Sequence, residues 1–357
     1  MRKGILASTI ILAFISGNLF AQDSTKSLTI SGSLDAYYRY NFANKGTNNF
    51  TSFTNSQNSF ELGMASIRAD ASAMSGKVTG VVDLGFGRRA EEFSYNDGIG
   101  SSKSGFVSLS NIKQLYVTYA PSSTVKFTMG KFATHVGYEL LDAPLNRNYS
   151  MSYMFTNGPF FHTGLKMDVT AGPVGFMLGV SNFTDQSTST IETKSLIGQL
   201  SGGTKDGKFK AYFNYVGSFG SKSKAIPGSL KSLSQFDLVI NAIVNTKFNI
   251  GANATLQQRN NGITDGSWKG AALYLNVDPT AMFGLTLRSE YITDSKLVYY
   301  DTKHIFANTL SLNFKAGPLT IIPELRVESA ASTRYLKSNG SNSKSTATVL
   351  LAAVYKF

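Results

Sequence analysis

The chain has 357 residues and a formal net charge of +12 at pH 7, and it contains 33 Gly, 25 Phe, 17 Tyr and no Cys. A chain without cysteine has neither a disulfide framework nor a thiolate metal site. The mean hydropathy is −0.07. The lack of a long apolar run after the N-terminus excludes a helical membrane protein, whereas a β-barrel hides its membrane surface in alternating residues. The Lys and Arg residues are scattered, which argues against nucleic-acid binding.

The N-terminus, residues 1–21, has the pattern of a secretory signal peptide. Arg2 and Lys3 form a basic start, an apolar core follows, and Ala21 is a small residue suited to cleavage. An N-terminal membrane anchor is the alternative, but a Ser-Gly-Asn sequence interrupts the apolar run too early for it. We therefore expect an exported protein whose mature part, 22–357, forms one domain.

The mature chain alternates apolar and polar residues with period 2, which is typical of strands with two unlike faces. In the first predicted strand, 28–42, Asp35 and Arg39 share one face while Ile30 and Leu34 share the other. A dry core would not tolerate unpaired charges on a strand face, whereas a water-filled lumen would. The same rhythm predicts strands at 60–72, 77–86, 112–119, 124–130, 161–170, 174–181, 195–201, 208–217, 236–244, 248–257, 268–277, 283–292, 304–314, 319–327 and 345–357.

The last predicted strand has a wholly apolar face that ends on Tyr355 and Phe357. A terminal aromatic of this kind resembles the C-terminal insertion signal of bacterial outer-membrane barrels, so these two residues are predicted to be an assembly signal for the barrel-assembly machinery. A soluble edge strand would also alternate. However, connections after odd strands are mostly long and polar, connections after even strands are mostly short, and aromatic residues gather at both ends of the strands.

These patterns predict an all-β fold, namely a transmembrane up-and-down antiparallel β-barrel of about sixteen strands. The expected location is the outer membrane of a Gram-negative cell, with outer-membrane lipid around the barrel. Barrels of about 16–18 strands enclose an aqueous channel. The sequence therefore favours a porin.

By strand parity, seven basic and seven acidic side chains face the lumen. They are Asp35, Arg39, Arg68, Asp70, Asp83, Lys126, Lys166, Asp168, Lys210, Asp237, Arg288, Glu290, Glu324 and Arg326. Much of the surplus positive charge lies in loops and turns, including Lys222, Lys224 and Lys231. Charges at the mouth of a pore are screened by salt. We therefore expect a weak preference for anions that declines at high salt.

The connection 131–160 is the most informative irregular segment. Loops this long are usually functional or disordered, and this one is too aromatic for a disordered tip. As the third long connection, it is predicted to enter the lumen and narrow the pore; the alternative is a folded outer lid. The candidate constriction residues are Tyr138, Glu139, Asp142, Arg147, Tyr149 and Tyr153.

The same region carries short motifs that resemble the middle of the OmpL-like β-barrel porin family. They are Gly130-Lys131-Phe132, Gly137-Tyr138-Glu139, Asn146-x-Asn148-Tyr149-Ser150, Ser152-Tyr153 and Pro159-x-x-His162-Thr163-Gly164. The resemblance extends over nearly the whole mature chain. It implies pore formation and supplies no catalytic residues.

The three histidines, His135, His162 and His304, have no partners at the spacing of a metal or catalytic site, so we expect no enzyme, metal or cofactor. The predicted function is passive diffusion of small hydrophilic solutes through an ion-permeable channel. The alternatives are a barrel for a specific solute such as a sugar or an acidic metabolite, a plugged structural or adhesion barrel, and a barrel enzyme. A homotrimer is expected only by analogy with general porins.

Overall fold

A computed structural model of the chain describes residues 26–97, 108–189, 192–219, 232–260, 265–294, 296–297 and 300–357. The predicted signal peptide and the predicted loop charges Lys222, Lys224 and Lys231 lie outside these residues. Within the described ranges, no helix is both long and apolar enough to cross a membrane.

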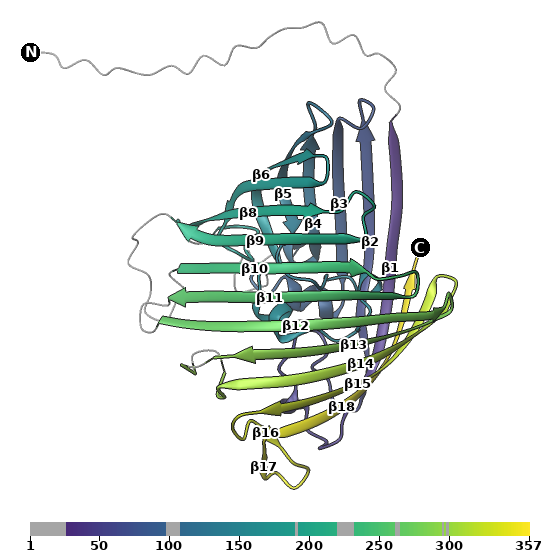
Figure 1. The fold of residues 1–357 in the computed structure, drawn as a ribbon, viewed down its shortest axis with the longest axis vertical. Coiled ribbons are helices and arrows are strands. Elements are labelled where there is room, and N and C mark those ends of the chain that lie inside the picture. The colour runs from purple at the N-terminus through teal and green to yellow at the C-terminus, as the bar shows by residue number, and fades with distance from the viewer. Residues whose placement is uncertain are drawn as a thin grey trace, which may run out of the picture.

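Sixteen strands form one closed antiparallel barrel (Figure 1). They are β1 (Ser27–Asn41), β2 (Ser59–Ala73), β3 (Val78–Phe86), β4 (Ile112–Tyr119), β5 (Val125–Ala133), β6 (Phe161–Ala171), β7 (Val174–Asn182), β8 (Lys194–Gly203), β9 (Phe209–Phe219), β10 (Ser232–Ile243), β11 (Phe248–Asn260), β12 (Asp265–Thr280), β13 (Phe283–Thr293), β14 (His304–Ala316), β15 (Leu319–Ala330) and β18 (Ser345–Lys356). A small separate hairpin, β16 (Tyr335–Leu336) and β17 (Asn342–Ser343), lies in the last long connection. The predicted fold class is confirmed.

The strands pair in sequence order, and the ring closes because β1 pairs with β18. In Figure 1 the strands of the near wall cross those of the far wall, as the tilt of strands in a barrel requires. Closure gives each of the sixteen barrel strands a partner on both sides. This is a condition for β-structure in hydrocarbon, because lipid offers backbone groups no hydrogen bonds.

The two faces of the wall differ as the alternation predicts. On β1, Leu28, Ile30 and Leu34 are exposed on the outside, while Asp35 and Arg39 are buried on the inside. Successive side chains of a strand point to opposite faces, so each strand contributes to both surfaces. An apolar exterior around a polar interior is the arrangement that lipid outside and a lumen inside require.

β5 continues beyond its predicted end at Gly130. This glycine has φ of 135° and lies so close to β4 that a Cβ would stand 2.1 Å from the carbonyl oxygen of Leu115. Only glycine permits this approach. The ladder therefore passes through the glycine and pairs Leu115 with Lys131.

The chain end completes the ring. Gly32 N donates to Phe357 O at 2.9 Å, and Phe357 N donates to Gly32 O at 3.0 Å. The Phe357 ring lies over Gly32, where a Cβ would stand 2.6 Å from ring atom Cζ. A small residue on β1 thus makes room for the last aromatic of β18.

Candidate functional site

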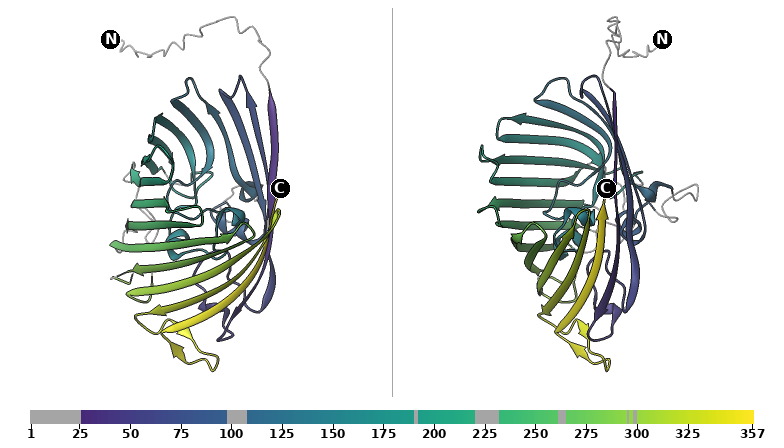
Figure 2. Two further views of the ribbon diagram at one scale, coloured as in Figure 1. Left: turned by 45° about the vertical axis from the view of Figure 1, so that its right-hand side comes forward. Right: turned by 90° about the vertical axis from the view of Figure 1, so that its right-hand side faces the viewer.

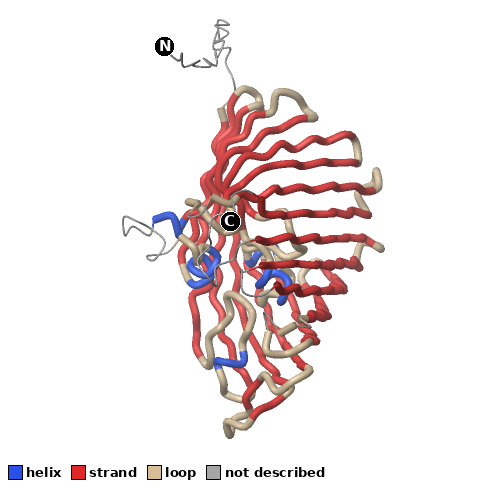
Figure 3. Tube along the Cα trace, turned by 90° about the vertical axis from the view of Figure 1, so that its left-hand side faces the viewer, coloured by secondary structure: helices blue, strands red, loops and turns tan. Residues whose placement is uncertain are grey.

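The connection between β5 and β6 crosses the inside of the barrel, and we call residues 134–160 the lumen segment. It contains the short helices η3 (Ala143–Leu145) and α2 (Tyr153–Asn157). Figures 2 and 3 show helical turns within the outline of the barrel. The segment bonds to inward-facing side chains of β1, β10 and β12 to β15. It therefore lies between the walls rather than over the rim.

Local hydrogen bonds give the lumen segment its shape. Ser152 Oγ accepts from Phe155 N at 3.1 Å and caps α2. The Asn146 side chain accepts from Leu140 N at 2.9 Å and donates to Leu140 O at 2.5 Å, which closes the turn around Pro144. Apolar packing adds to this, because Ala143 and Tyr149 cover inward side chains of β15 and β18.

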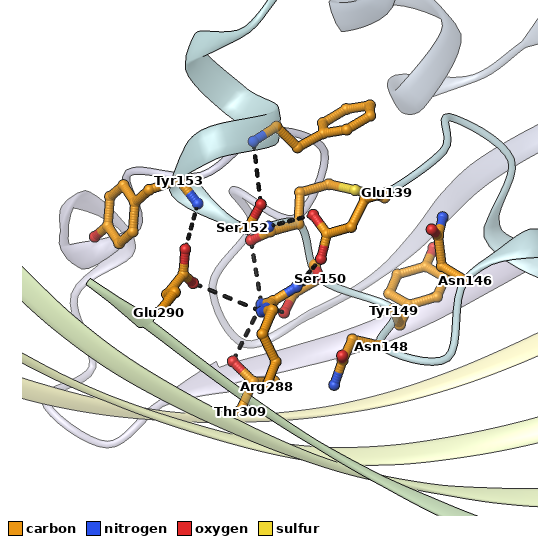
Figure 4. Close-up of polar contacts among 12 residues, drawn as sticks. Glu139, Asn146, Asn148, Tyr149, Ser150, Ser152, Tyr153, Arg288, Glu290 and Thr309 are labelled. Carbon is orange, nitrogen blue, oxygen red and sulfur yellow. Dashed lines mark hydrogen bonds and ion pairs between the residues drawn. The ribbon is translucent and has the colours of Figure 1, made fainter. Parts of the chain in front are cut away.

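Arg288 on β13 is the centre of the contacts in Figure 4. Its guanidinium is fully buried and donates to Glu139 Oε1 at 2.5 Å, Ser150 O at 2.7 Å and Thr309 Oγ1 at 3.1 Å. Glu139 also accepts from Ser152 N at 2.7 Å. The planar fork of arginine suits several simultaneous acceptors. Arg288, a predicted wall charge, therefore holds the side chain of Glu139, a candidate constriction residue, by an ion pair.

Two tyrosines tie the lumen segment to one side of the wall, where β1, β18, β15, β14 and β13 are neighbours. Tyr149 Oη donates to Asp35 Oδ1 at 2.5 Å, and Tyr149 N donates to Glu324 Oε2 at 2.9 Å. Tyr153 N donates to Glu290 Oε2 at 2.7 Å. Acidic wall residues thus serve as acceptors for the segment rather than as free charges in water.

The other three candidate constriction residues also contact the wall. Arg147 makes two hydrogen bonds of 2.9 Å to the Asp278 carboxylate. Tyr138 stacks on Tyr274 with ring centroids 4.0 Å apart, and Asp142 pairs with Lys113 at 2.5 Å. None of the six candidate side chains is exposed. Their role in a constriction stays a prediction.

The most accessible residues of the lumen segment are apolar. Every residue of the segment is described, and its exposed residues are Leu140 and Leu145, with 44% and 61% of their surface accessible. Nothing in the alternation of the strands indicates these residues, because they lie in an irregular segment. Many polar groups of the segment bond to the wall or within the segment, and its two exposed residues are leucines.

The fourteen predicted wall charges fall into three groups. Seven contact the lumen segment or another long connection: Asp35, Arg39, Asp237, Arg288, Glu290, Glu324 and Arg326. Five pair along the wall: Arg68, Asp70, Asp83, Lys166 and Asp168. Lys126 and Lys210 are exposed. Most of the predicted charges therefore hold structure in place, and the accessible charge is mainly basic.

Sequence reasoning missed several residues that shape the lumen. Arg89 of α1 (Arg88–Phe93) is fully buried, donates to Leu141 O and Tyr149 O at 3.1 and 3.2 Å, and lies over the Phe53 ring. It comes from the long connection between β3 and β4, for which the alternation of connection lengths predicts only a long, polar loop. The aromatic residues of the long connections, such as Phe53 and Phe93, are the feature of the sequence that could have indicated buried contacts there.

The buried carboxylate of Asp185 lies at the C-terminal end of the lumen segment. It joins three connections, those that follow β3, β5 and β7. Asp185 Oδ1 accepts from Phe160 N at 2.6 Å and Phe161 N at 3.1 Å, and Asp185 Oδ2 accepts from Tyr95 Oη at 3.1 Å. Burial raises the pKa of Asp185 to about 6 in spite of these hydrogen bonds. For His135 the pKa shift has the opposite direction, because burial lowers the pKa of this imidazole to about 4.

Cavities lie on both sides of the lumen segment. One of about 550 Å³ lies among the long connections and is lined by Tyr95, Phe160 and Asp185, among others. Another of about 540 Å³ lies toward the short turns and is lined by Lys126 and Lys166, among others. Two smaller ones, of about 360 and 210 Å³, lie toward the turns on the β10 to β18 side.

A closed barrel with an apolar exterior, a polar interior and a long connection folded across the lumen defines the outer-membrane porin class of channels. The family model described as "Putative beta-barrel porin-2, OmpL-like" matches residues 27–357. The chain belongs to this OmpL-like porin family, as the motifs of the lumen segment predict.

Solved porins share the fold at low sequence identity. The outer membrane channel DcaP of Acinetobacter baumannii is 12% identical with a TM-score of 0.63, over 93% of this chain and 97% of DcaP. The trimer form of OmpT of Vibrio cholerae is 11% identical with a TM-score of 0.62, over 93% and 99%. The anion-selective porin from Comamonas acidovorans is 10% identical with a TM-score of 0.59, over 93% and 100%. No curated protein sequence matches the chain.

Proposed function

We propose that the protein is a porin through which small hydrophilic solutes diffuse passively. The observation that supports this most is the lumen segment, which lies across the inside of the barrel with cavities of about 550 and 540 Å³ on its two sides. A wall of polar groups around a narrowed lumen selects solutes by size and charge. Membership of the OmpL-like porin family supports the same function.

The preference for anions is weak in this proposal. Paired groups such as Arg68 and Asp70, 2.7 Å apart, cancel one another, while Lys126 and Lys210 are exposed at the turn end of the lumen. Two exposed cations attract anions at low salt, and salt screens them over about 8 Å under physiological conditions.

The test is the reversal potential of purified protein in planar bilayers under a KCl gradient, at low salt and at about 1 M salt. We expect a small anion preference at low salt that nearly vanishes at high salt. K126E combined with K210E should shift the reversal potential toward cations. A strong anion preference that persists at high salt would contradict the balanced interior.

Two alternatives remain distinct in this experiment. The dense hydrogen bonding of the lumen segment favours a plugged structural barrel as the second candidate, and such a barrel would give no conductance. A barrel for one specific solute would instead conduct and show saturable uptake of that solute.

We further propose how the chain reaches its site. Residues 1–21 direct export, and the terminal residues Tyr355 and Phe357 are recognised by the barrel-assembly machinery. The trimer form of the OmpT neighbour supports a homotrimer in outer-membrane lipid. Crosslinking in intact cells tests the trimer, and N-terminal sequencing of the mature protein tests the cleavage after Ala21.

A further inference from the structure

The two exposed leucines of the lumen segment differ in their surroundings. A single exposed leucine on a protein surface needs no explanation. Leu145, however, lies inside a barrel on a segment whose other residues, apart from Leu140, are buried or half-buried. Leu145 borders both of the smaller cavities on the turn side of the segment, whereas Leu140 borders neither.

The cavity of about 360 Å³ combines an apolar surface with positive charge. Its apolar lining includes Pro144, Leu145, Ile322 and Val354. The cationic residues of its lining are Arg147, Lys315 and Lys356. The volume is at the lower end of the range of about 300–1,000 Å³ that is typical of small-molecule sites.

The charge around this cavity is positive in sum. Asp278 is shared, because it accepts two bonds of 2.9 Å from Arg147 and lies 3.2 Å from Lys315 Nζ. In the described part of the chain, no ion pair within 4.0 Å involves Lys356. Arg147, Lys315 and Lys356 are therefore three cations around one shared carboxylate, that of Asp278.

We propose that this cavity binds a small amphipathic monocarboxylate, with an aliphatic chain or an aromatic ring as its apolar part. The apolar part lies on Leu145 and Ile322, and the carboxylate lies among Arg147, Lys315 and Lys356. The proposal rests on the proposed channel function, because the solute reaches the cavity through the lumen. A neutral sugar lacks both features that the lining matches.

The direct test is calorimetric binding to the full, folded protein in detergent, with hexanoate as the probe. We expect saturable hexanoate binding, with acetate and 1-hexanol each at least about 5-fold weaker, since each lacks one half of the ligand. L145S and K356Q should each weaken hexanoate binding at least about 5-fold. L140S is the matched control, because it removes the other exposed leucine and should leave binding unchanged.

Binding and conductance are measured separately, so their failures are distinguishable. A conducting channel that does not bind hexanoate, or that loses binding equally in L140S and L145S, would overturn the assignment of the cavity and leave the porin function intact. Hexanoate binding to a barrel without conductance would support the cavity and contradict the channel. Glucose binding with no hexanoate binding would also overturn the proposal.

Discussion

At the scale of single residues, inward-facing charges of this barrel act mainly as anchors. Arg288 and Glu290 are buried, and each bonds to the lumen segment. Burying charges is costly, and the loss of one partner leaves the other uncompensated. The chemistry of each anchor can therefore be tested by a single substitution.

Replacing Arg288 by Met should destabilise the lumen segment. The wild-type Arg288 guanidinium lies 2.5 Å from the Glu139 carboxylate, and the substitution leaves that carboxylate buried without a cation. This should lower the free energy that holds the segment in place by about 3–5 kcal/mol. We expect higher or noisier single-channel conductance, with a barrel that still folds. R288K is the matched control and should have a smaller effect, because it keeps the charge but loses the fork. Equal conductance in all three proteins would show that Arg288 does not hold the segment.

Protonation of Asp185 should raise the free energy of unfolding in mild acid. Its pKa in the folded protein is about 6, which is above the ordinary value of 3.8. The folded state therefore binds the proton more tightly than the unfolded state, so stability increases as pH falls from above 6 toward 4. The effect is at most about 3 kcal/mol.

Denaturant unfolding at pH 5 and pH 7.5 measures this dependence. D185N keeps an oxygen that accepts from Phe160 N and Phe161 N but carries no charge. It should therefore reduce the difference between the two pH values. The prediction would be contradicted if the unfolding free energy changed between pH 7.5 and pH 5 by the same amount in the wild-type protein and in D185N.

At the scale of elements, the strands and the lumen segment make separate contributions. The strands are paired around the ring without the segment. The segment depends on the wall, because its backbone and side chains bond to residues of β1, β13 and β15. The wall should therefore form without the segment, whereas the segment should not keep its shape without the wall.

Deleting residues 138–153 and joining the ends with a Gly-Ser linker tests this dependence. The acidic and basic side chains that the segment covers would then face water, where their charge is solvated. We expect a folded, heat-modifiable barrel with higher conductance and passage of larger solutes. Wild-type conductance from a folded deletion protein would show that the segment does not limit the pore.

At the scale of the whole molecule, closure of the ring depends on the contact between β1 and the end of β18. Deleting Phe357 removes two backbone hydrogen bonds of 2.9 and 3.0 Å and the ring over Gly32. An open barrel edge in lipid leaves backbone groups without partners. We expect lower outer-membrane amounts and less of the heat-modifiable folded form.

A glycine substitution separates the contact from the chain end. G32A should show a milder form of the same defect, because its Cβ would stand 2.4 Å from Ser66 O and 2.6 Å from Phe357 Cζ. G80A is the control, since no heavy atom lies within 4 Å of a Cβ at that position. Normal assembly of both the deletion protein and G32A would contradict a role for this contact.

The sequence by itself determined the wall of the barrel. Lipid outside and polar groups inside act on every second residue, so the rule is local and can be read along one strand, as Leu34 and Asp35 illustrate. The pattern of the last strand and the alternation of loop lengths added the closed up-and-down order of the strands. Residue parity also assigns charges to the inner face, and their role as pore-wall charges stays a prediction.

Only the tertiary structure decided what those charges contact. Glu139 and Arg288 are 149 residues apart in the chain, and no periodic pattern connects them. The lumen segment had the right composition for an inner loop, but its orientation depends on partners from distant strands. Many of its polar groups bond to the wall, and Leu140 and Leu145 are its exposed residues. Strand faces follow from the solvent on each side, whereas the filling of the lumen follows from contacts between segments far apart in sequence.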